Sequence, residues 1–258
     1  MAGRLILSPC LEWLFADGGR PFSQRIHAAA EAGFSQVEFW TASDKDIDGL
    51  EHALRETAVA VTCFVSEPVG RLVDPESHDQ FLRGIERSTL LAVRLKARNL
   101  IVLSGDSRDG VERRRQRDAL TDALKRAAPI ASRAGVRLLL EPLNTHVDHP
   151  GYFLDSTAEA LEVIRDVNDP AVRLLFDLYH STVMGEDPQQ VLAGAGHLIG
   201  HVHVADVPGR HEPGAGTIDW SLQLGVLRSA GYSGPLGLEY RPSRDTESSL
   251  EFVRGLSA

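Results

Sequence analysis

The sequence alternates, from one end to the other, between short apolar runs and longer segments with helical periodicity. We count eight such pairs, the pattern of βα units around a parallel sheet. Most of the short runs are nearly continuous in Val, Ile and Leu, as expected for strands that are buried on both faces. The predicted strands are Leu5–Ser8, Gln36–Trp40, Ala60–Val65, Asn99–Leu103, Val136–Glu141, Arg173–Asp177, Gly200–Val204 and Leu236–Tyr240.

Several of the longer segments carry the residues that begin or end helices. Gly33, Gly135 and Gly231 each follow such a segment and precede a predicted strand, which is the place of a C′ glycine in the left-handed conformation. Ser156 and Asp219 stand where N-caps are expected. The predicted helices are Phe22–Ala32, Ile47–Glu56, His78–Lys96, Val111–Ala134, Thr157–Val167, Pro188–Ala195, Trp220–Ala230 and Thr246–Leu256.

Nothing in the sequence divides the chain into two domains. Its 258 residues are close to the ~250 typical of an eight-fold α/β barrel, and no low-complexity linker or break in composition interrupts them. Pro129 lies inside the fourth helical segment, and we expect it to kink or split that helix. The prediction is an α/β protein with one (β/α)₈ TIM barrel domain over residues 1–258, whose active site lies at the C-terminal ends of the strands.

Composition excludes several other classes of protein. The chain has 27 Lys and Arg against 36 Asp and Glu, a formal net charge of −9, which gives no positive field for nucleic acid or anionic lipid. Cys10 and Cys63 are too few for a disulfide framework or a cysteine-based metal site. The N-terminal run MAGRLILSPCLEWLF is too weak for a secretion signal and too short to span a bilayer. We expect a cytoplasmic protein that binds neither nucleic acid nor membranes, and the sequence leaves a homo-oligomer open.

Four predicted strands end in a side chain that can bind a metal: Glu141, Asp177, His203 and Glu239. In a closed barrel the ends of the fifth to eighth strands share one arc of the mouth, so these side chains can converge. Each alone could be an ordinary polar residue at a strand end, but ionised carboxylates after buried apolar runs are costly without a partner. Three carboxylates and one imidazole suit Mn²⁺, Mg²⁺ or Co²⁺ better than a closed structural zinc site, with Zn²⁺ also possible.

Longer motifs around these residues resemble the hydroxypyruvate isomerase branch of the xylose isomerase-like barrels, a superfamily that also includes ketose 3-epimerases. The motifs are EPLN at 141–144, FDLYH at 176–180, GHVHVADVPGRHEPGAGTIDW at 200–220 and GLEYRP at 237–242. The resemblance implies that Glu141, Asp177, His203 and Glu239 bind one divalent metal, and that the two glutamates also move protons. Members of the hydroxypyruvate branch often have Gln at the position of His203, whereas the epimerases have His.

Two further residues are candidates for substrate binding. The resemblance implies a substrate-binding histidine at His180, three residues after Asp177, and a solvated loop histidine is the alternative. Arg210 lies in a loop rich in Gly and Pro, from which a guanidinium can bind a substrate carboxylate or a pair of oxygens. A surface arginine is the alternative there. For Arg241 we favour a salt bridge on the rim over a role in the site.

The remaining polar and aromatic residues near strand ends have less definite roles. The sequence does not assign Glu38, and it does not decide between a site role and a loop-holding role for His211. We expect His201 to point to the opposite side of its strand from the ligand histidine and to pack against a helix. Trp13 and Trp40 could form an apolar wall at the mouth.

The predicted activity is a 1,2-proton shift between a 2-hydroxy aldehyde and a hydroxy ketone, as in the interconversion of hydroxypyruvate and tartronate semialdehyde. A metal holds the two oxygens, and Glu141 and Glu239 transfer the proton. A ketose 3-epimerase or another sugar isomerase of the same superfamily is the main alternative. A three-zinc nuclease is disfavoured by the acidic chain, and a sugar-binding barrel would not need paired glutamates around a metal.

Overall fold

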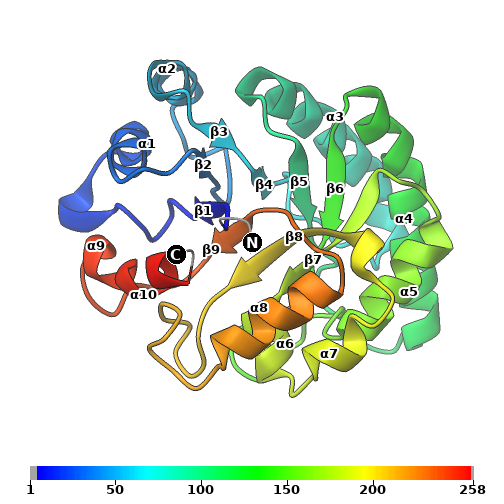
Figure 1. The fold of residues 1–258 in the computed structure, drawn as a ribbon. Coiled ribbons are helices and arrows are strands. Elements are labelled where there is room, and N and C mark those ends of the chain that lie inside the picture. Colours follow the sequence, from blue (N-terminus) through cyan, green and yellow to red (C-terminus); the bar gives the residue numbers. More distant parts are fainter. Residues whose placement is uncertain (1–4, 257–258) are drawn as a thin grey trace.

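A ring of parallel strands forms the centre of the molecule, and helices surround it (Figure 1). The structure is a computed structural model that describes residues 5–256. The strands are β1 Leu7–Pro9, β2 Gln36–Val37, β3 Ala60–Val61, β4 Cys63–Val65, β5 Asn99–Val102, β6 Arg137–Leu140, β7 Val172–Asp177, β8 Ile199–Val204 and β9 Leu236–Leu238.

The order of strand pairing closes the ring. Seven strands pair in the order β1-β9-β8-β7-β6-β5-β4, and all these pairings are parallel. Strands β2 and β3 pair with each other, and a bridge between Cys10 and Glu38 connects this pair to the end of β1. The predicted TIM barrel is confirmed, and each of the eight predicted segments overlaps at least one strand, with bounds that differ by a few residues.

The predicted third strand is divided in two. Thr62 separates β3 from β4, because β3 pairs with β2 on one side and β4 pairs with β5 on the other. The Thr62 hydroxyl lies 2.8 Å from the Ser8 hydroxyl and donates to the Gln36 side-chain oxygen at 3.0 Å. These polar contacts fill a place that an apolar residue would occupy in an uninterrupted strand.

The helices follow the predicted segments closely. They are α1 Phe22–Glu31, α2 Ile47–Thr57, α3 His78–Leu95, α4 Arg113–Arg133, α5 Thr157–Val167, α6 Leu178–Val183, α7 Pro188–Val191, α8 Trp220–Ser229, α9 Thr246–Ser249 and α10 Glu251–Gly255, with 3₁₀ turns at Asp17–Gly19, Pro75–Ser77 and Gly196–Leu198. The side chains of Ser156 and Asp219 accept the backbone N–H groups of Glu159 and Leu222, which confirms both N-caps. The three C′ glycines have positive φ, as expected.

Four helical features differ from the sequence prediction. The predicted helix Pro188–Ala195 ends at Val191 in α7, and the predicted helix Thr246–Leu256 is divided into α9 and α10. Helix α4 runs unbroken through Pro129, so the predicted split is wrong. The loss of one backbone hydrogen bond is offset by burial of the apolar face of α4 on both sides of the proline, from Leu124 to Ala131. Helix α6 was not predicted, and it begins where the Asp177 carboxylate accepts the backbone N–H groups of two residues in its first turn.

Most of the buried apolar side chains lie between the strands and the helices. A second cluster on β4 to β7 contains Cys63, Val65, Ile101, Leu139 and Leu175. Val65 and Ile101 also line the cavity described below. The core of the barrel therefore supports the wall of the site directly.

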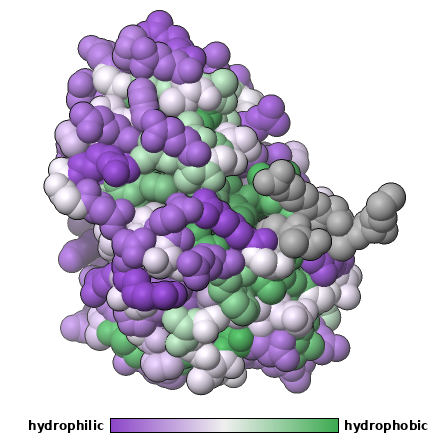
Figure 2. Space-filling model, turned by 60° about the vertical axis from the view of Figure 1, so that its left-hand side comes forward, coloured by the Kyte–Doolittle hydropathy of each residue, from purple (hydrophilic) through white to green (hydrophobic). Residues whose placement is uncertain are grey.

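The face of the molecule that carries α1, α2, α9 and α10 is largely polar. Figure 2 shows hydrophilic residues over most of the side formed by α1, α2, α9 and α10, with apolar residues gathered in a band across its middle. Within residues 5–256, no helix has the length and apolarity needed to cross a bilayer. Residues 1–4 of the N-terminal run, which we did not interpret as a secretion signal, lie outside the described part of the chain.

Candidate active site

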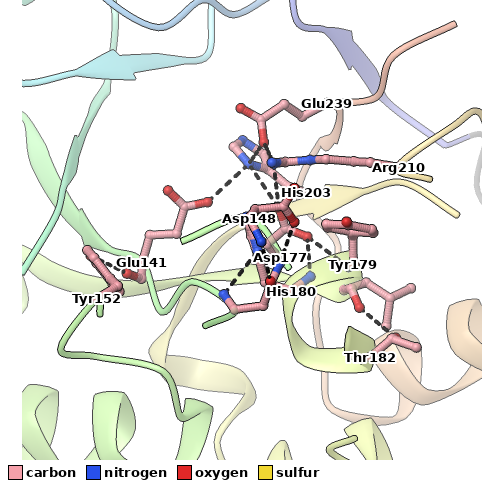
Figure 3. Close-up of polar contacts among 12 residues, drawn as sticks. Glu141, Asp148, Tyr152, Asp177, Tyr179, His180, Thr182, His203, Arg210 and Glu239 are labelled. Carbon is pink, nitrogen blue, oxygen red and sulfur yellow. Dashed lines mark hydrogen bonds and ion pairs between the residues drawn. The ribbon is translucent and has the colours of Figure 1, made fainter. Parts of the chain in front are cut away.

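The structure brings the four predicted metal ligands together at the ends of four neighbouring strands. Glu141 follows β6, Asp177 ends β7, His203 lies in β8 and Glu239 follows β9. Asp177 and His203 are register partners across β7 and β8. All four side chains are buried, with exposed fractions of 2–6%, and Figure 3 shows them pointing toward one another.

Nδ1 of His203 is the centre of this group. It lies 3.4 Å from Oε2 of Glu239, 3.5 Å from Oε1 of Glu141 and 4.0 Å from Oδ2 of Asp177. This nitrogen is buried and has no hydrogen-bonding partner, and the four potential ligand atoms all lie within 4.8 Å of one another. A nitrogen without a partner, facing three buried carboxylates, fits a divalent cation by both charge and donor type.

Arg210 enters this group from the loop between β8 and α8. Its guanidinium contacts Oε2 of Glu239 and lies 3.3 Å from Oδ2 of Asp177. The same group stands over two rings, 5.3 Å from the centroid of Trp13 and 5.1 Å from that of Tyr179. The predicted position of Arg210 at the site is therefore observed, but its partners in this structure are carboxylates of the ligand set.

The two glutamates have different electrostatic surroundings. Burial raises the pKa of Glu141 to about 7, although the neighbouring His203 opposes this shift. Burial also raises the pKa of Glu239. The positive charges of Arg210 and His203 outweigh this effect and hold the pKa of the Glu239 carboxyl below its usual range. Nε1 of Trp40 also donates to Oε1 of Glu239 at 2.6 Å. Trp40 is thus a polar partner of the site as well as part of its wall.

His180 is oriented by the backbone of the loop that follows β6. Its Nδ1 accepts the backbone N–H of Asn144 at 3.1 Å. Burial lowers the pKa of His180 well below its ordinary value, so the ring is neutral. With Nδ1 as acceptor, the proton resides on Nε2, which is buried without a hydrogen-bonding partner 3.6 Å from Oδ2 of Asp177. His180 can therefore donate a hydrogen bond from Nε2 to a molecule in the cavity.

Glu141, His180, Arg210 and Glu239 line a cavity of about 570 Å³ at the mouth of the barrel. The lining residues are Trp13, Trp40, Thr41, Val65, Val69, Ile101, Leu103, Glu141, Leu143, Val147, Asp148, His149, Tyr179, His180, Gly209, Arg210, Glu239 and Arg241. Apolar and aromatic side chains thus surround a small number of charged groups, which is the usual composition of a small-molecule site.

The comparisons with known proteins agree on the fold and the family. The family model described as xylose isomerase-like TIM barrel matches residues 26–256. Hydroxypyruvate isomerase of Escherichia coli (strain K12) is 30% identical over 256 residues, which cover 96% of this chain and 98% of that protein. The chain belongs to the xylose isomerase-like TIM barrel family. The predicted family and the prediction of an isomerase are confirmed.

Two more proteins match the chain over almost its whole length. 2-Oxo-tetronate isomerase of Pectobacterium atrosepticum is 29% identical, and the match covers 93% of each protein. The crystal structure of AP endonuclease, family 2 from Brucella melitensis is 31% identical with a TM-score of 0.90, covering 96% of this chain and 98% of that one.

The prediction for His201 is wrong. Residues two apart on a strand point to the same side, so His201 faces the barrel interior together with His203. Nε2 of His201 lies 2.9 Å from Oε2 of Glu38, and Nε2 of His203 lies 3.0 Å from Oε1 of the same carboxylate. The charges of His203 and His201 outweigh burial and lower the pKa of Glu38 to about 2. Glu38 is therefore an ionised partner of both rings.

The residues on the rim hold the loop that carries Arg210. Arg241 has no ion pair among residues 5–256, contrary to prediction, and its guanidinium stands 5.6 Å from the ring centroid of Trp13. Its backbone N–H donates to the carbonyl of Arg210 at 2.8 Å. Nδ1 of His211 lies 2.9 Å from the backbone oxygen of Arg241. His211 thus contacts the rim rather than the ligand set.

The same loop is organised by Asp206, which the sequence analysis did not single out. Its carboxylate accepts the backbone N–H groups of Val207, Gly214 and Ile218 and the Nε1–H of Trp220, at 2.8–3.1 Å. These hydrogen bonds lower the pKa of Asp206 below its usual value, against the effect of burial. One fully buried carboxylate therefore fixes both ends of the loop around Arg210.

We expect Asp206→Asn to lower the free energy of unfolding by about 1–3 kcal/mol, because a neutral amide replaces an ionised acceptor of several N–H groups. The pKa of Asp206 in the folded protein is lower than in the unfolded chain. The stability that this carboxylate contributes is therefore present at neutral pH and is lost as the pH falls through the pKa of the folded state. Urea unfolding at neutral and acidic pH measures both effects. The matched control is Asp219→Asn at the exposed N-cap of α8, where Asn caps as well as Asp. Equal stability of the two variants would contradict this role.

Proposed function

We propose that the protein binds one divalent metal through Glu141, Asp177, His203 and Glu239, and isomerises a small hydroxy-oxo acid. The interconversion of hydroxypyruvate and tartronate semialdehyde, or of a close relative, is the favoured reaction. The observation that carries this proposal is the buried Nδ1 of His203, which faces three carboxylates and has no hydrogen-bonding partner.

The donor set favours Mn²⁺, Mg²⁺ or Co²⁺, because three of the four ligands are carboxylates and none is a thiolate. Zn²⁺ is also compatible with this set. When bound, such an ion supplies a Lewis acid that orients the two substrate oxygens and offsets the charge that develops during enolisation.

The remaining steps fall to side chains of the cavity. One of Glu141 and Glu239 removes the proton next to the carbonyl, and the other, or the same one, returns it on the neighbouring carbon. The Nε2–H of His180 donates to a substrate oxygen, since His180 lines the cavity, this nitrogen has no hydrogen-bonding partner within the protein and its tautomer is fixed by Asn144. Trp13 and Trp40 pack edge to face in the lining of the cavity, with ring centroids 5.0 Å apart, and would exclude water from a bound substrate.

The positively charged side chains of the cavity support a carboxylic acid as the substrate. Arg210 and Arg241 are the two cationic side chains among the lining residues, and a guanidinium binds a carboxylate through paired hydrogen bonds. The two relatives named as isomerases are named for hydroxypyruvate and 2-oxo-tetronate, both of which are carboxylic acids. The net charge of −9 argues against nucleic acid as substrate. His203 resembles the epimerases instead, so free ketoses are the competing substrates.

Metal binding can be tested directly. We expect metal-free wild-type protein to bind one Mn²⁺ per chain in isothermal titration calorimetry, and Asp177→Ala to bind it at least about tenfold more weakly because an anionic ligand is lost. The control is Asp187→Asn, at the exposed N-cap of α7. Unchanged affinity in Asp177→Ala would remove Asp177 from the site.

Proton transfer is measured by incorporation of solvent deuterium into substrate. In Glu141→Gln and in Glu239→Gln we expect exchange to fall by at least about a hundredfold, the lower end of what a general acid or base contributes. The metal content of each variant is measured in parallel, so that loss of the ion is not mistaken for loss of the base. Near-normal exchange in either variant would show that its glutamate serves only as a ligand.

The substrate class is decided by comparing kcat/KM for hydroxypyruvate with that for fructose, tagatose and psicose. We expect the acid to be preferred, and Arg210→Ala to lower kcat/KM for the acid by about tenfold or more while affecting the ketoses less, since an ionic hydrogen bond is lost only with the acid. The control is Arg108→Ala, whose partner Asp74 lies outside the cavity. Better turnover of ketoses, with equal effects of Arg210→Ala on both classes, would replace the acid isomerase with an epimerase.

A further inference from the structure

A second buried polar group lies in the barrel interior, on the side of His203 away from the carboxylates of the site. It consists of Glu38, His201 and the Nε2 side of the His203 ring, and the exposed fractions of these residues are only 0–2%. Oε2 of Glu38 pairs with Nε2 of His201 at 2.9 Å, and Oε1 lies 3.0 Å from Nε2 of His203. The contact between Oε1 of Glu38 and Nε2 of His203 is an ion-pair contact without hydrogen-bond geometry, and neither atom has another hydrogen-bonding partner among the described residues.

We propose that Glu38 is a positioning residue that aims Nδ1 of His203 at the metal. This inference rests on the proposed function, because it requires His203 to be a ligand. A carboxylate can only accept hydrogen bonds, so the nitrogen that faces it keeps its proton. In a neutral imidazole the other nitrogen then carries the lone pair. The carboxylate at Nε2 thus selects the tautomer in which Nδ1, the nitrogen near the three acidic ligands, binds the ion.

Glu38 is itself held firmly in place. Its backbone N–H donates to the carbonyl of Pro9 at 3.0 Å, and its carbonyl accepts the N–H of Leu11 at 2.8 Å. The ion pair with His201 fixes the second carboxylate oxygen. Glu38 therefore has little freedom to turn away from His203.

The neighbouring strand leaves space for this arrangement. Gly237 of β9 is the register partner of His203 in β8. A Cβ at Gly237 would lie 2.3 Å from Oε1 of Glu38, 2.5 Å from Cδ2 of His203 and 2.8 Å from Nε2 of His201. All three distances are too short for a real contact. The absence of a side chain at this one position is what allows the three groups to meet.

A second metal ion at this place is the competing interpretation. Glu38, Cys63, His201 and His203 offer four ligand atoms within 4.8 Å of one another. However, two tetrahedral ligands of one Zn²⁺ are separated by roughly 3.3 Å or more, given Zn–N and Zn–O distances of about 2.0–2.1 Å. The distances of 2.9 and 3.0 Å from Glu38 to the two histidines are those of directly paired groups instead.

The test is a titration of the metal-free full chain with Mn²⁺ by isothermal titration calorimetry. We expect Glu38→Ala to weaken binding by about 10–100-fold, the usual effect of losing the partner of a ligand histidine. Glu38→Gln should recover part of the affinity, because its amide oxygen can still accept the Nε2–H. The matched control is Glu186→Gln. Glu186 accepts hydrogen bonds from Thr157 and Ser181, and its loss should change affinity by less than about twofold.

A spectroscopic measurement on the wild type keeps the inference testable if the variants fail to fold. In ¹⁵N-histidine-labelled protein loaded with ¹¹³Cd²⁺, the scalar coupling should appear at Nδ1 of His203, with a protonated Nε2. Coupling at Nε2 would overturn the proposal, as would binding of a second ion per chain that Cys63→Ser abolishes. Wild-type affinity in Glu38→Ala would overturn the role of Glu38 and leave the metal site standing. If the wild type bound no Mn²⁺ or Cd²⁺, the proposed function would fail, and this inference with it.

Discussion

The burial of three carboxylates around one imidazole nitrogen is the constraint on which the rest of this site depends. Glu141, Asp177 and Glu239 surround Nδ1 of His203 at 3.4–4.0 Å, nearly out of contact with solvent. Buried like charges lose hydration and repel one another, so the arrangement demands positive charge. Arg210 supplies part of this charge. A divalent ion would supply the rest, which is why the proposed function begins from electrostatics rather than from the fold.

Residues on both sides of the site hold these carboxylates, the imidazole and Arg210 in place. Strand register places Asp177 beside His203 and His203 beside Gly237. Below the ligands, Glu38 occupies the space that the glycine leaves open. Above them, Asp206 shapes the loop that carries the guanidinium of Arg210. The carboxylates of Glu38 and Asp206 both accept hydrogen bonds, whereas Nδ1 of His203 is left without a hydrogen-bonding partner between them. A buried polar atom without a partner costs stability, so this nitrogen marks the place where a ligand is expected.

The sequence predicted the barrel and the convergence of the four candidate ligand side chains, because both follow from local pattern. Apolar runs form the strands, and the polar residue near the end of each run lies at the mouth. Contacts that depend on the path of a loop or on the direction of a side chain were not predictable in this way. No local sequence pattern indicates the hydrogen bond from Trp40 to Glu239 or the set of hydrogen bonds that the Asp206 carboxylate accepts. The error at His201 was different, since correct use of strand alternation would have placed it beside His203.

Arg210 connects metal binding with the choice of substrate. Its guanidinium contacts Asp177 and Glu239, two of the carboxylates that are proposed to bind the ion. On the proposed function, an ion and the guanidinium would therefore interact with the same two carboxylates, and the divalent charge would weaken the attraction between Glu239 and Arg210. The rings of Trp13 and Tyr179 still support the guanidinium. Arg210 would then face a cavity in which a substrate carboxylate can replace the lost partner. Metal binding and the preference for an acid would thus be connected through the guanidinium that the ion releases.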